Sequence, residues 1–319
     1  MTLRINCWSG PRNISTSFMY AFGQRADTKV FDEPIYAHYL RVTGRQHPGR
    51  AEVLASQDPD GEAVVRDVIL GDHPTTVVFF KQMAQHAVDL DLDFLKSCRN
   101  MLLIRDPERV VTSFAKNVPD VGVADTGLSI QVELLEAMLA AGEEPLVVDS
   151  AALLASPEPM LRLLCGRLGL PFDPAMLSWP AGPKPADGVW AKHWYASTHR
   201  STGFEAGVPS TEPVPTYLRP VVAEARSLRA TRGLRARRLT GRPDPTDRPG
   251  HLDSDTGGQV VEPIGWKNYH RDQSTVDLVG HYSTEGDDLV WFDHQDGGRA
   301  RPGTDRLAQG AASRTGAPA

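Results

Sequence analysis

The residues best suited to chemistry lie within the first twenty positions, where a glycine and several hydroxyl side chains follow an apolar run. Residues 3–8 have the pattern of a buried strand, and residues 15–22 have the pattern of a helix. A tight loop, residues 9–14, joins them. A strand, a loop and a helix in this order direct backbone N–H groups and the positive end of the helix dipole at one point. We therefore expect an anion such as a phosphate to bind here.

The loop departs from the nucleotide-binding pattern G-x-x-x-x-G-K-[ST] at the position that carries the charge. Gly10 falls on the first glycine and Ser17 on the final hydroxyl, but Ser15 and Thr16 stand where the second glycine and the lysine are expected. Arg12 is the side-chain cation within the loop. We expect the whole segment to bind the co-substrate, that is Gly10, Pro11, Arg12, Asn13, Ile14, Ser15, Thr16 and Ser17.

A second candidate site begins where another apolar run ends. Arg105 directly follows this run, and the carboxyl ends of strands are where open α/β sheets bind ligands. Ser113 comes eight residues later, about two helical turns, so its hydroxyl and the Arg105 guanidinium could converge on one further phosphate. An alternative remains open, in which Arg105 or Arg109 forms an ion pair with Asp106 or Glu108 at the start of a helix.

Together, the two segments resemble the sulfotransferases that use 3′-phosphoadenylyl sulfate. In that family the first loop, often P-[KR]-[ST]-[GS]-[ST]-[ST]-like, binds the 5′-phosphosulfate, and residues 11–17 look like a variant with Asn13 and Ile14 in place of small residues. The second family motif binds the 3′-phosphate through an arginine at a strand end and a serine eight residues later. Arg105 and Ser113 are similar to it in type and spacing.

The resemblance covers most of residues 1–205, and residues 146–172 look like the family's strand, loop and helix. It implies an α/β fold, a three-layer parallel sheet with P-loop nucleotide-binding, sulfotransferase-like architecture. It also implies 3′-phosphoadenylyl sulfate as co-substrate and no metal, because a sulfuryl group carries less charge than a phosphoryl group and positioned donors suffice.

An acceptor hydroxyl needs a base, and Glu33 is the first candidate. Several branches of the family place a catalytic glutamate after the first helix, a position that Glu33 resembles. A partly desolvated carboxylate beside the acceptor is suited to take its proton. Asp32 could serve instead, and Glu33 could equally cap the turn before Pro34 or pair with Arg25.

Lys81 and His86 form a rival site, similar to the strand-end lysine and the following histidine base of cytosolic family members. We expect His86 to be a surface residue, and Lys81 to stabilise the leaving group near the sulfuryl oxygens. The candidate catalytic residues are therefore Glu33, Arg12, Lys81 and His86.

Short apolar runs that alternate with amphipathic segments predict the parallel sheet that positions these residues. Residues 179–220 are rich in Trp, His, Pro and Gly and are expected to close over the sheet edge, followed by a short helix at 221–229. The aromatic residues that could line an acceptor pocket, or simply pack, are Tyr36, His38, Tyr39, Trp190, His193, Trp194, Tyr195 and Phe204. The predicted strands are residues 3–8, 75–80, 100–104 and 145–148, and the predicted helices are residues 15–22, 107–116, 129–141 and 157–168.

Bulk composition narrows the class of protein. A formal net charge of -6 argues against binding to a nucleic acid backbone. Three widely spaced cysteines suggest neither a disulfide framework nor a zinc site, and fit a cytoplasmic protein. The sequence has no apolar run of the length of a membrane span. We expect one domain over residues 1–240, and over 241–319 a Pro/Gly/Asp-rich linker and tail, largely disordered, with a small hairpin within 258–293.

The sequence thus predicts an enzyme that transfers a sulfuryl group from 3′-phosphoadenylyl sulfate to a hydroxyl of a small-molecule acceptor. Two alternatives stay open at this point. One is a P-loop kinase-like phosphotransferase, against which the missing lysine argues. The other is a catalytically inactive nucleotide-binding module. Neither the acceptor nor the oligomeric state follows from the sequence.

Overall fold

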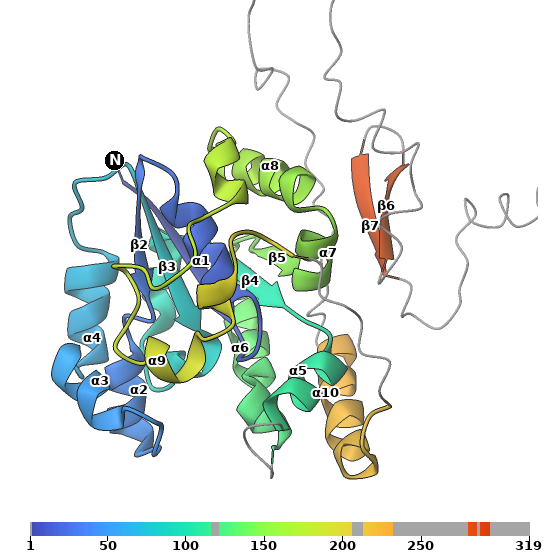
Figure 1. The fold of residues 1–319 in the computed structure, drawn as a ribbon, viewed down its shortest axis with the longest axis horizontal. Coiled ribbons are helices and arrows are strands. Elements are labelled where there is room, and N and C mark those ends of the chain that lie inside the picture. Colours follow the sequence, from blue (N-terminus) through green and yellow to red (C-terminus); the bar gives the residue numbers. More distant parts are fainter. Residues whose placement is uncertain (1, 116–120, 206–212, 232–279, 286–287, 294–319) are drawn as a thin grey trace, which may run out of the picture. The chain divides into compact units, whose positions relative to one another are not determined.

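A five-stranded parallel sheet forms the centre of the first of two units (Figure 1). The computed structural model describes residues 2–115, 121–205, 213–231, 280–285 and 288–293. The chain divides into the compact units Met1–Arg237 and Arg238–Ala319. In the first unit the strand order is β2-β3-β1-β4-β5. These strands are β1 (Leu3–Ser9), β2 (Thr28–Asp32), β3 (Val77–Met83), β4 (Arg99–Ile104) and β5 (Leu146–Asp149).

This strand order creates a switch point beside β1. The chain leaves β1 towards β2 at one edge of the sheet, whereas it leaves β4 towards β5 at the other edge. The loops that follow β1 and β4 therefore diverge, and the crevice between such loops is where open α/β sheets bind ligands. Both anion-binding segments predicted from the sequence begin at this crevice.

Helices cover both faces of the sheet, so the α/β prediction of three layers is confirmed (Figure 1). On one face Phe22 of α1 stacks on Phe79 of β3, with ring centroids 4.3 Å apart. On the other face Leu134 and Leu135 of α6 are buried in the main core, together with strand side chains such as Trp8. The helices are α1 (Ser15–Gly23), α2 (Tyr36–Thr43), α3 (Arg50–Ser56), α4 (Gly61–Val64), α5 (Pro107–Ala115), α6 (Leu128–Ala140), α7 (Ser150–Ala155), α8 (Pro157–Leu168), α9 (Ala191–Trp194) and α10 (Arg219–Thr231).

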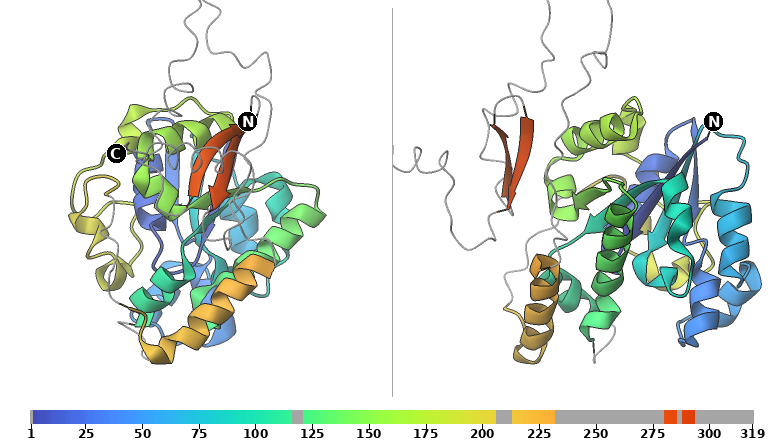
Figure 2. Two further views of the ribbon diagram at one scale, coloured as in Figure 1. Left: turned by 90° about the vertical axis from the view of Figure 1, so that its right-hand side faces the viewer. Right: turned by 180° about the vertical axis from the view of Figure 1, so that it is seen from behind.

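The predicted strands and helices correspond to β1, β3, β4 and β5 and to α1, α5, α6 and α8. The sequence pattern does not indicate β2, because Thr28–Asp32 is a short edge strand with only partial burial over most of its length. The predicted helix at 221–229 is part of the longer α10. Figure 2 shows α10 lying along α5, which it contacts together with α6.

The start of α5 is fixed by its own sequence. Pro107 occupies the first turn, where its missing N–H costs no hydrogen bond. Asp106 accepts the backbone N–H of Glu108 at 2.7 Å and of Arg109 at 3.3 Å. The helix therefore begins directly after Arg105, which holds that arginine at the carboxyl end of β4.

Residues 187–195, which we call the strap, cross the carboxyl ends of β2 and β3. The backbone N–H of Gly188 donates to Asp32 at the end of β2, and the Tyr195 hydroxyl contacts Lys81 on β3. The expected closure over the sheet edge thus holds for this part of 179–220, whereas residues 206–212 lie outside the described residues.

In the second unit, β6 (Gly280–Glu285) and β7 (Asp288–Asp293) form an antiparallel pair, with Gly280 opposite Asp293. This pair falls within the hairpin predicted for 258–293. The rest of that range and the predicted linker and tail at 241–257 and 294–319 lie outside the described residues.

Three further observations concern the described part of the chain. None of its helices combines the length and apolar character of a transmembrane span. Within the same residues, no group of three or more His, Cys, Asp or Glu side chains could hold a metal ion. Cys7, Cys98 and Cys165 are buried and free.

Candidate active site

The loop after β1 presents the uncapped start of a helix. Ile14 stands at the N-cap of α1, and no described side chain caps the helix there, so its first N–H groups face outward without a side-chain partner. A glycine is needed at position 10 because the loop lies close to the backbone of Thr126: a Cβ at this position would lie 2.3 Å from the Thr126 carbonyl oxygen. Arg12 has a φ of 58°, a left-handed conformation that curls the loop around its N–H groups.

Asn13, which stands where the resemblance leads us to expect a small residue, pins this loop to the sheet. Its Nδ2 donates to the Leu103 carbonyl on β4 at 2.9 Å, and its Oδ1 accepts the Ile14 N–H at 2.9 Å. The side chain therefore turns away from the anion position. An asparagine here is compatible with an open loop.

The two predicted anion-binding segments meet. The Arg12 Nε donates to the Ser113 Oγ at 3.0 Å, and Arg105 donates to the Arg12 carbonyl oxygen. A small hollow beside them is lined by Gly10, Asn13, Arg105 and residues of α5, α6 and α10. Burial, together with the Arg109 and Arg12 guanidinium groups, lowers the pKa of Arg105 from its usual value. Three guanidinium groups thus gather at the switch point, where an anion would relieve their repulsion.

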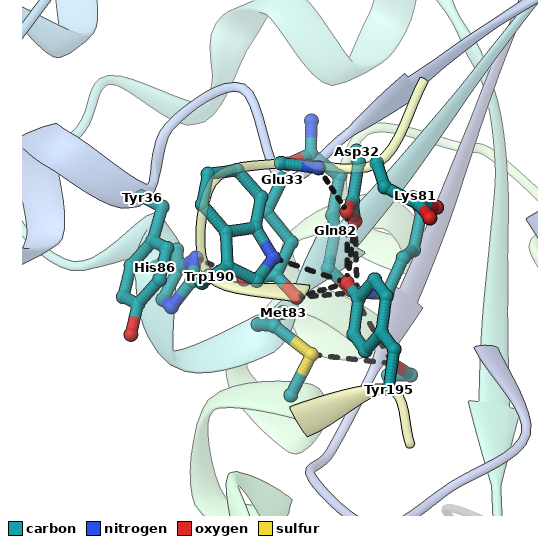
Figure 3. A network of polar contacts seen from close by, with 12 residues as sticks. Asp32, Glu33, Tyr36, Lys81, Gln82, Met83, His86, Trp190 and Tyr195 are labelled. Atoms are coloured by element: carbon teal, nitrogen blue, oxygen red, sulfur yellow. Dashed lines mark hydrogen bonds and ion pairs between the residues drawn. The ribbon is translucent and has the colours of Figure 1, made fainter. Parts of the chain in front are cut away.

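A second polar cluster lies at the carboxyl ends of β2 and β3 (Figure 3). Asp32 and Lys81 are direct register partners in these neighbouring strands. The Lys81 Nζ donates to Asp32 Oδ1 at 3.0 Å, to the Tyr195 hydroxyl at 2.6 Å and to Glu33 Oε1. An ammonium group has three N–H donors, so this buried lysine, 1% exposed, uses all of them.

Glu33 is held in place by its backbone as well as by Lys81. It has a φ of 46°, which is strained for a residue with a side chain. Its N–H donates to the Lys81 carbonyl at 2.8 Å, and its carbonyl accepts from Gln57 at 3.0 Å. These bonds turn the carboxylate towards Lys81 and His86.

One positive charge, that of Lys81, faces two carboxylates, those of Asp32 and Glu33. Burial raises the pKa of Glu33, Lys81 opposes that rise, and the negative charge of Asp32 adds to it. Burial alone would lower the pKa of Lys81, but the two carboxylates outweigh it and raise the pKa above its usual value. Lys81 therefore stays charged. Glu33 is a carboxylate with a raised proton affinity, as a general base requires.

His86 is a buried neighbour of Glu33. Its ring packs against those of Tyr36 and Tyr39, with centroids 4.5 Å and 4.7 Å away, and its Nδ1 lies 3.8 Å from Glu33 Oε2. Burial, together with His47, Lys81 and His38, lowers the pKa of His86 well below its usual value. The imidazole is therefore neutral at physiological pH.

Comparison with known proteins identifies the family. A family model described as "Sulfotransferase domain" matches residues 3–230. The chain belongs to this family. Two similar proteins of Arabidopsis thaliana are "Branched-chain-amino-acid aminotransferase-like protein 1" and "protein 2", which are 41% and 38% identical over 216 residues. The match covers 67% of this chain but 39% and 38% of those proteins, so the chain spans about two fifths of their length.

Solved structures similar to this chain are also sulfotransferases. The "Sulfotransferase Domain from the Curacin Biosynthetic Pathway" is 14% identical with a TM-score of 0.44, and the match covers 72% of this chain and 97% of that one. The sulfotransferase from Alicyclobacillus acidocaldarius is 13% identical with a TM-score of 0.42, over 73% of this chain and 96% of that one.

One expectation about the candidate base residues is wrong, and one alternative is excluded. His86 was expected at the surface, yet it is 2% exposed, with the Tyr36 and Tyr39 rings of α2 packed against it. The alternative pairing of Glu33 with Arg25 does not form, since Arg25 pairs with Asp27 at 2.8 Å and the Glu33 carboxylate pairs with Lys81.

The expected contact of Lys81 with a sulfuryl oxygen is not available in this arrangement, because its three N–H donors are engaged. The alternative role of Glu108 in an ion pair at the start of α5 is also replaced, since Glu108 pairs with Arg226 of α10 at 2.6 Å. Arg105 and Ser113, which the sequence predicts to bind an anion, both contact Arg12.

The aromatic residues are divided between two places. Tyr36, Tyr39, Trp190 and Tyr195 share one buried cluster, with Trp194 packed against it. Phe204 packs on Trp179 instead, with centroids 5.1 Å apart. No role for the Tyr195 hydroxyl follows from the sequence, because no local motif marks it. The pairing of Asp32 with Lys81 would have followed from recognising β2, since β2 and β3 are neighbouring parallel strands that bring these two residues into register.

Proposed function

We propose that this member of the sulfotransferase family transfers a sulfuryl group from 3′-phosphoadenylyl sulfate to a hydroxyl of a small-molecule acceptor. The observation that carries the proposal is the convergence of Arg12, Arg105 and Ser113 at the switch point of the sheet. A donor with phosphate groups at both ends of one ribose needs two anion sites side by side. The start of α1 supplies one, and Arg105 with Ser113 supplies the other.

In the proposed reaction, Glu33 takes the proton of the acceptor hydroxyl. The acceptor oxygen forms a new bond to sulfur while the bond between sulfur and the 5′-phosphate oxygen breaks. The electron pair of that bond stays on the phosphate, which leaves as part of 3′-phosphoadenosine 5′-phosphate. Glu33 Oε2 has no hydrogen bond from the described residues and is therefore the oxygen free to accept the proton.

Binding of the nucleotide product tests the anion sites. Calorimetry with 3′-phosphoadenosine 5′-phosphate should give a dissociation constant in the micromolar range, and Arg105→Ala should weaken it about 10- to 100-fold, as expected for charge-assisted hydrogen bonds. Arg99→Ala is the matched control, because Arg99 is exposed at the opposite end of the same strand. Equal binding by the Arg105 variant and the wild type would remove the second motif from the proposal.

Transfer itself is tested with the ³⁵S-labelled donor and a panel of alcohols and phenols. Glu33→Gln should reduce kcat about 10²- to 10⁴-fold while nucleotide binding stays unchanged. Glu133→Gln, an exposed site on α6, is the control. Magnesium-dependent turnover of ATP would indicate a kinase instead. Nucleotide binding without transfer to any acceptor would indicate a binding module that lacks chemistry.

A further inference from the structure

The Tyr195 hydroxyl joins the strap to both charged residues at the strand ends (Figure 3). We propose that Tyr195 is a positioning residue: by occupying Asp32 together with Lys81, it leaves Glu33 as the carboxylate that acts as base. This inference rests on the proposed sulfuryl transfer and adds to it the reason why one of two adjacent carboxylates is selected.

Each donor and acceptor position of the Tyr195 hydroxyl takes part in a hydrogen bond. The oxygen accepts from Lys81 Nζ at 2.6 Å and from Trp190 Nε1 at 3.1 Å. Its own proton is shared with the Asp32 carboxylate, whose oxygens lie at 2.8 Å and 2.9 Å. A hydroxyl has one donor and two acceptor positions, so the group is saturated. Burial and the charges of Asp32 and Glu33 raise the pKa of Tyr195 well above its usual value, which keeps the phenol protonated as a donor.

The carboxylates of Asp32 and Glu33 differ in whether an oxygen atom lacks a hydrogen-bond donor among the described residues. Asp32 accepts from three donors: Lys81 at Oδ1, the Gly188 N–H at Oδ2 (3.1 Å), and the one Tyr195 proton, which the two oxygens share. The Asp32 side chain is 1% exposed, whereas that of Glu33 is 8% exposed and engages its described donors through Oε1. Asp32 thus has both oxygens engaged, whereas Glu33 keeps Oε2 without a described donor, so the proton of an acceptor goes to Glu33.

The strap therefore does more than cross the strand ends: through Tyr195 it supplies hydrogen bonds on which the role of Glu33 as the base depends. Without the Tyr195 hydroxyl, one N–H of Lys81 and one lone pair of Asp32 lose their partner inside a buried site. Asp32 would then have an acceptor position free to take a proton, as Glu33 does. No described contact joins Tyr195 to the loop after β1 or to Arg105, so the loss should fall on the chemical step rather than on nucleotide binding.

The test compares Tyr195→Phe with Tyr20→Phe. The Tyr20 hydroxyl donates to Asp187 at 2.6 Å and so anchors the same strap without contacting Lys81 or Glu33. For Tyr195→Phe we expect kcat to fall at least tenfold, with KM for the donor within twofold of the wild type. For Tyr20→Phe we expect kcat within twofold. Equal losses in both variants, or no loss in Tyr195→Phe, would overturn the proposal.

A second measurement does not depend on activity. In ¹⁵N-lysine-labelled protein, a buried ammonium group with three acceptors exchanges its protons slowly and gives an NMR signal that Lys81→Met assigns by its absence. We expect this signal in the wild type and in Tyr20→Phe, and its loss or broadening in Tyr195→Phe. An unchanged signal in Tyr195→Phe refutes the positioning role. A wild type that shows the signal but transfers no sulfuryl group would refute the proposed function alone.

Discussion

Replacing Lys81 with methionine removes the positive charge from between two buried carboxylates. The Lys81 Nζ lies 3.0 Å from Asp32 Oδ1 and also donates to Glu33. All three side chains are almost inaccessible to solvent, so water cannot take over the lost contacts. Methionine has a similar length and no charge, which limits the change in packing.

The expected loss of stability is large. At 3.0 Å and an effective dielectric constant of about 20, one such pair attracts by about 5–6 kcal/mol. Removal of one partner from a buried pair costs about 3–5 kcal/mol in practice, because the remaining charge is left uncompensated. Since domains are stable by about 5–15 kcal/mol, the variant should lose a large share of its free energy of unfolding. The melting temperature should fall by about 6–20 °C for a unit of this size.

The loss should depend on pH in a defined direction. Lys81 holds down the pKa of Glu33, which burial already raises, so its removal raises that pKa further. When the pKa of a carboxyl is higher in the folded state than in the unfolded state, stability is retained below the unfolded value and is lost as the pH rises through the folded value. The variant should therefore be closest to the wild type near pH 4–5 (about the ordinary Glu pKa) and most destabilised above pH 7.

Urea denaturation across this pH range measures the effect. Lys96→Met is the matched control, since Lys96 pairs with Asp93 on the surface, where solvent screening leaves such a pair little effect on stability. Adding Glu33→Gln to Lys81→Met should restore part of the lost stability by removing one uncompensated charge. A Lys81 variant that is no less stable than the control, or whose loss does not grow with pH, would refute the charge balance described for this cluster.

Three further outcomes are expected. Gly10→Ala places a Cβ 2.3 Å from the Thr126 carbonyl oxygen, so the loop must shift; thermal unfolding should show a loss of about 1–3 kcal/mol, and calorimetry should show weaker nucleotide binding. Gln82 is fully buried with both amide atoms unpartnered among the described residues, so Gln82→Met should stabilise the protein by about 1–3 kcal/mol in urea titration, and a loss instead would mean that the amide holds a bound partner. The kcat of the wild type should rise with pH along a limb set by the raised pKa of Glu33, above the usual carboxylic acid range, and a limb at or below that range would exclude Glu33 as the base.

Much of the fold follows from local patterns along the chain. Buried strands and amphipathic helices recur in alternation, and Asp106 and Pro107 mark the start of α5 in the sequence itself. The missed strand, Thr28–Asp32, lies at the sheet edge, where partial burial removes the continuous apolar run that marks a central strand. Its omission hid the pairing of Asp32 with Lys81.

The site was predictable to the extent that its residues lie next to strand ends. Arg105 and Glu33 each follow a strand directly and Arg12 lies in the loop after β1, and topology brings such positions to one edge of a sheet. Tyr195 was not predictable, because its contact with Asp32 spans 163 positions and depends on how the strap crosses the strands. The burial of His86 was not predictable either, because it depends on how the Tyr36 and Tyr39 rings of α2 pack against it, which no local sequence pattern indicates.

The missing lysine of the first loop now has a structural context. Arg12, the cation of the loop, donates to Ser113. Lys81 donates its three N–H groups to Asp32, Glu33 and Tyr195. Neither side chain is directed at the start of α1. In the proposed reaction, the charge that develops on the 5′-phosphate as its bond to sulfur breaks would therefore be stabilised there chiefly by backbone N–H groups and hydroxyls, which are preorganised donors. Such donors suit a group of modest charge. The arrangement is therefore consistent with the proposed sulfuryl transfer rather than phosphoryl transfer, since among the described residues no lysine stands at the start of α1 where phosphoryl transfer requires one.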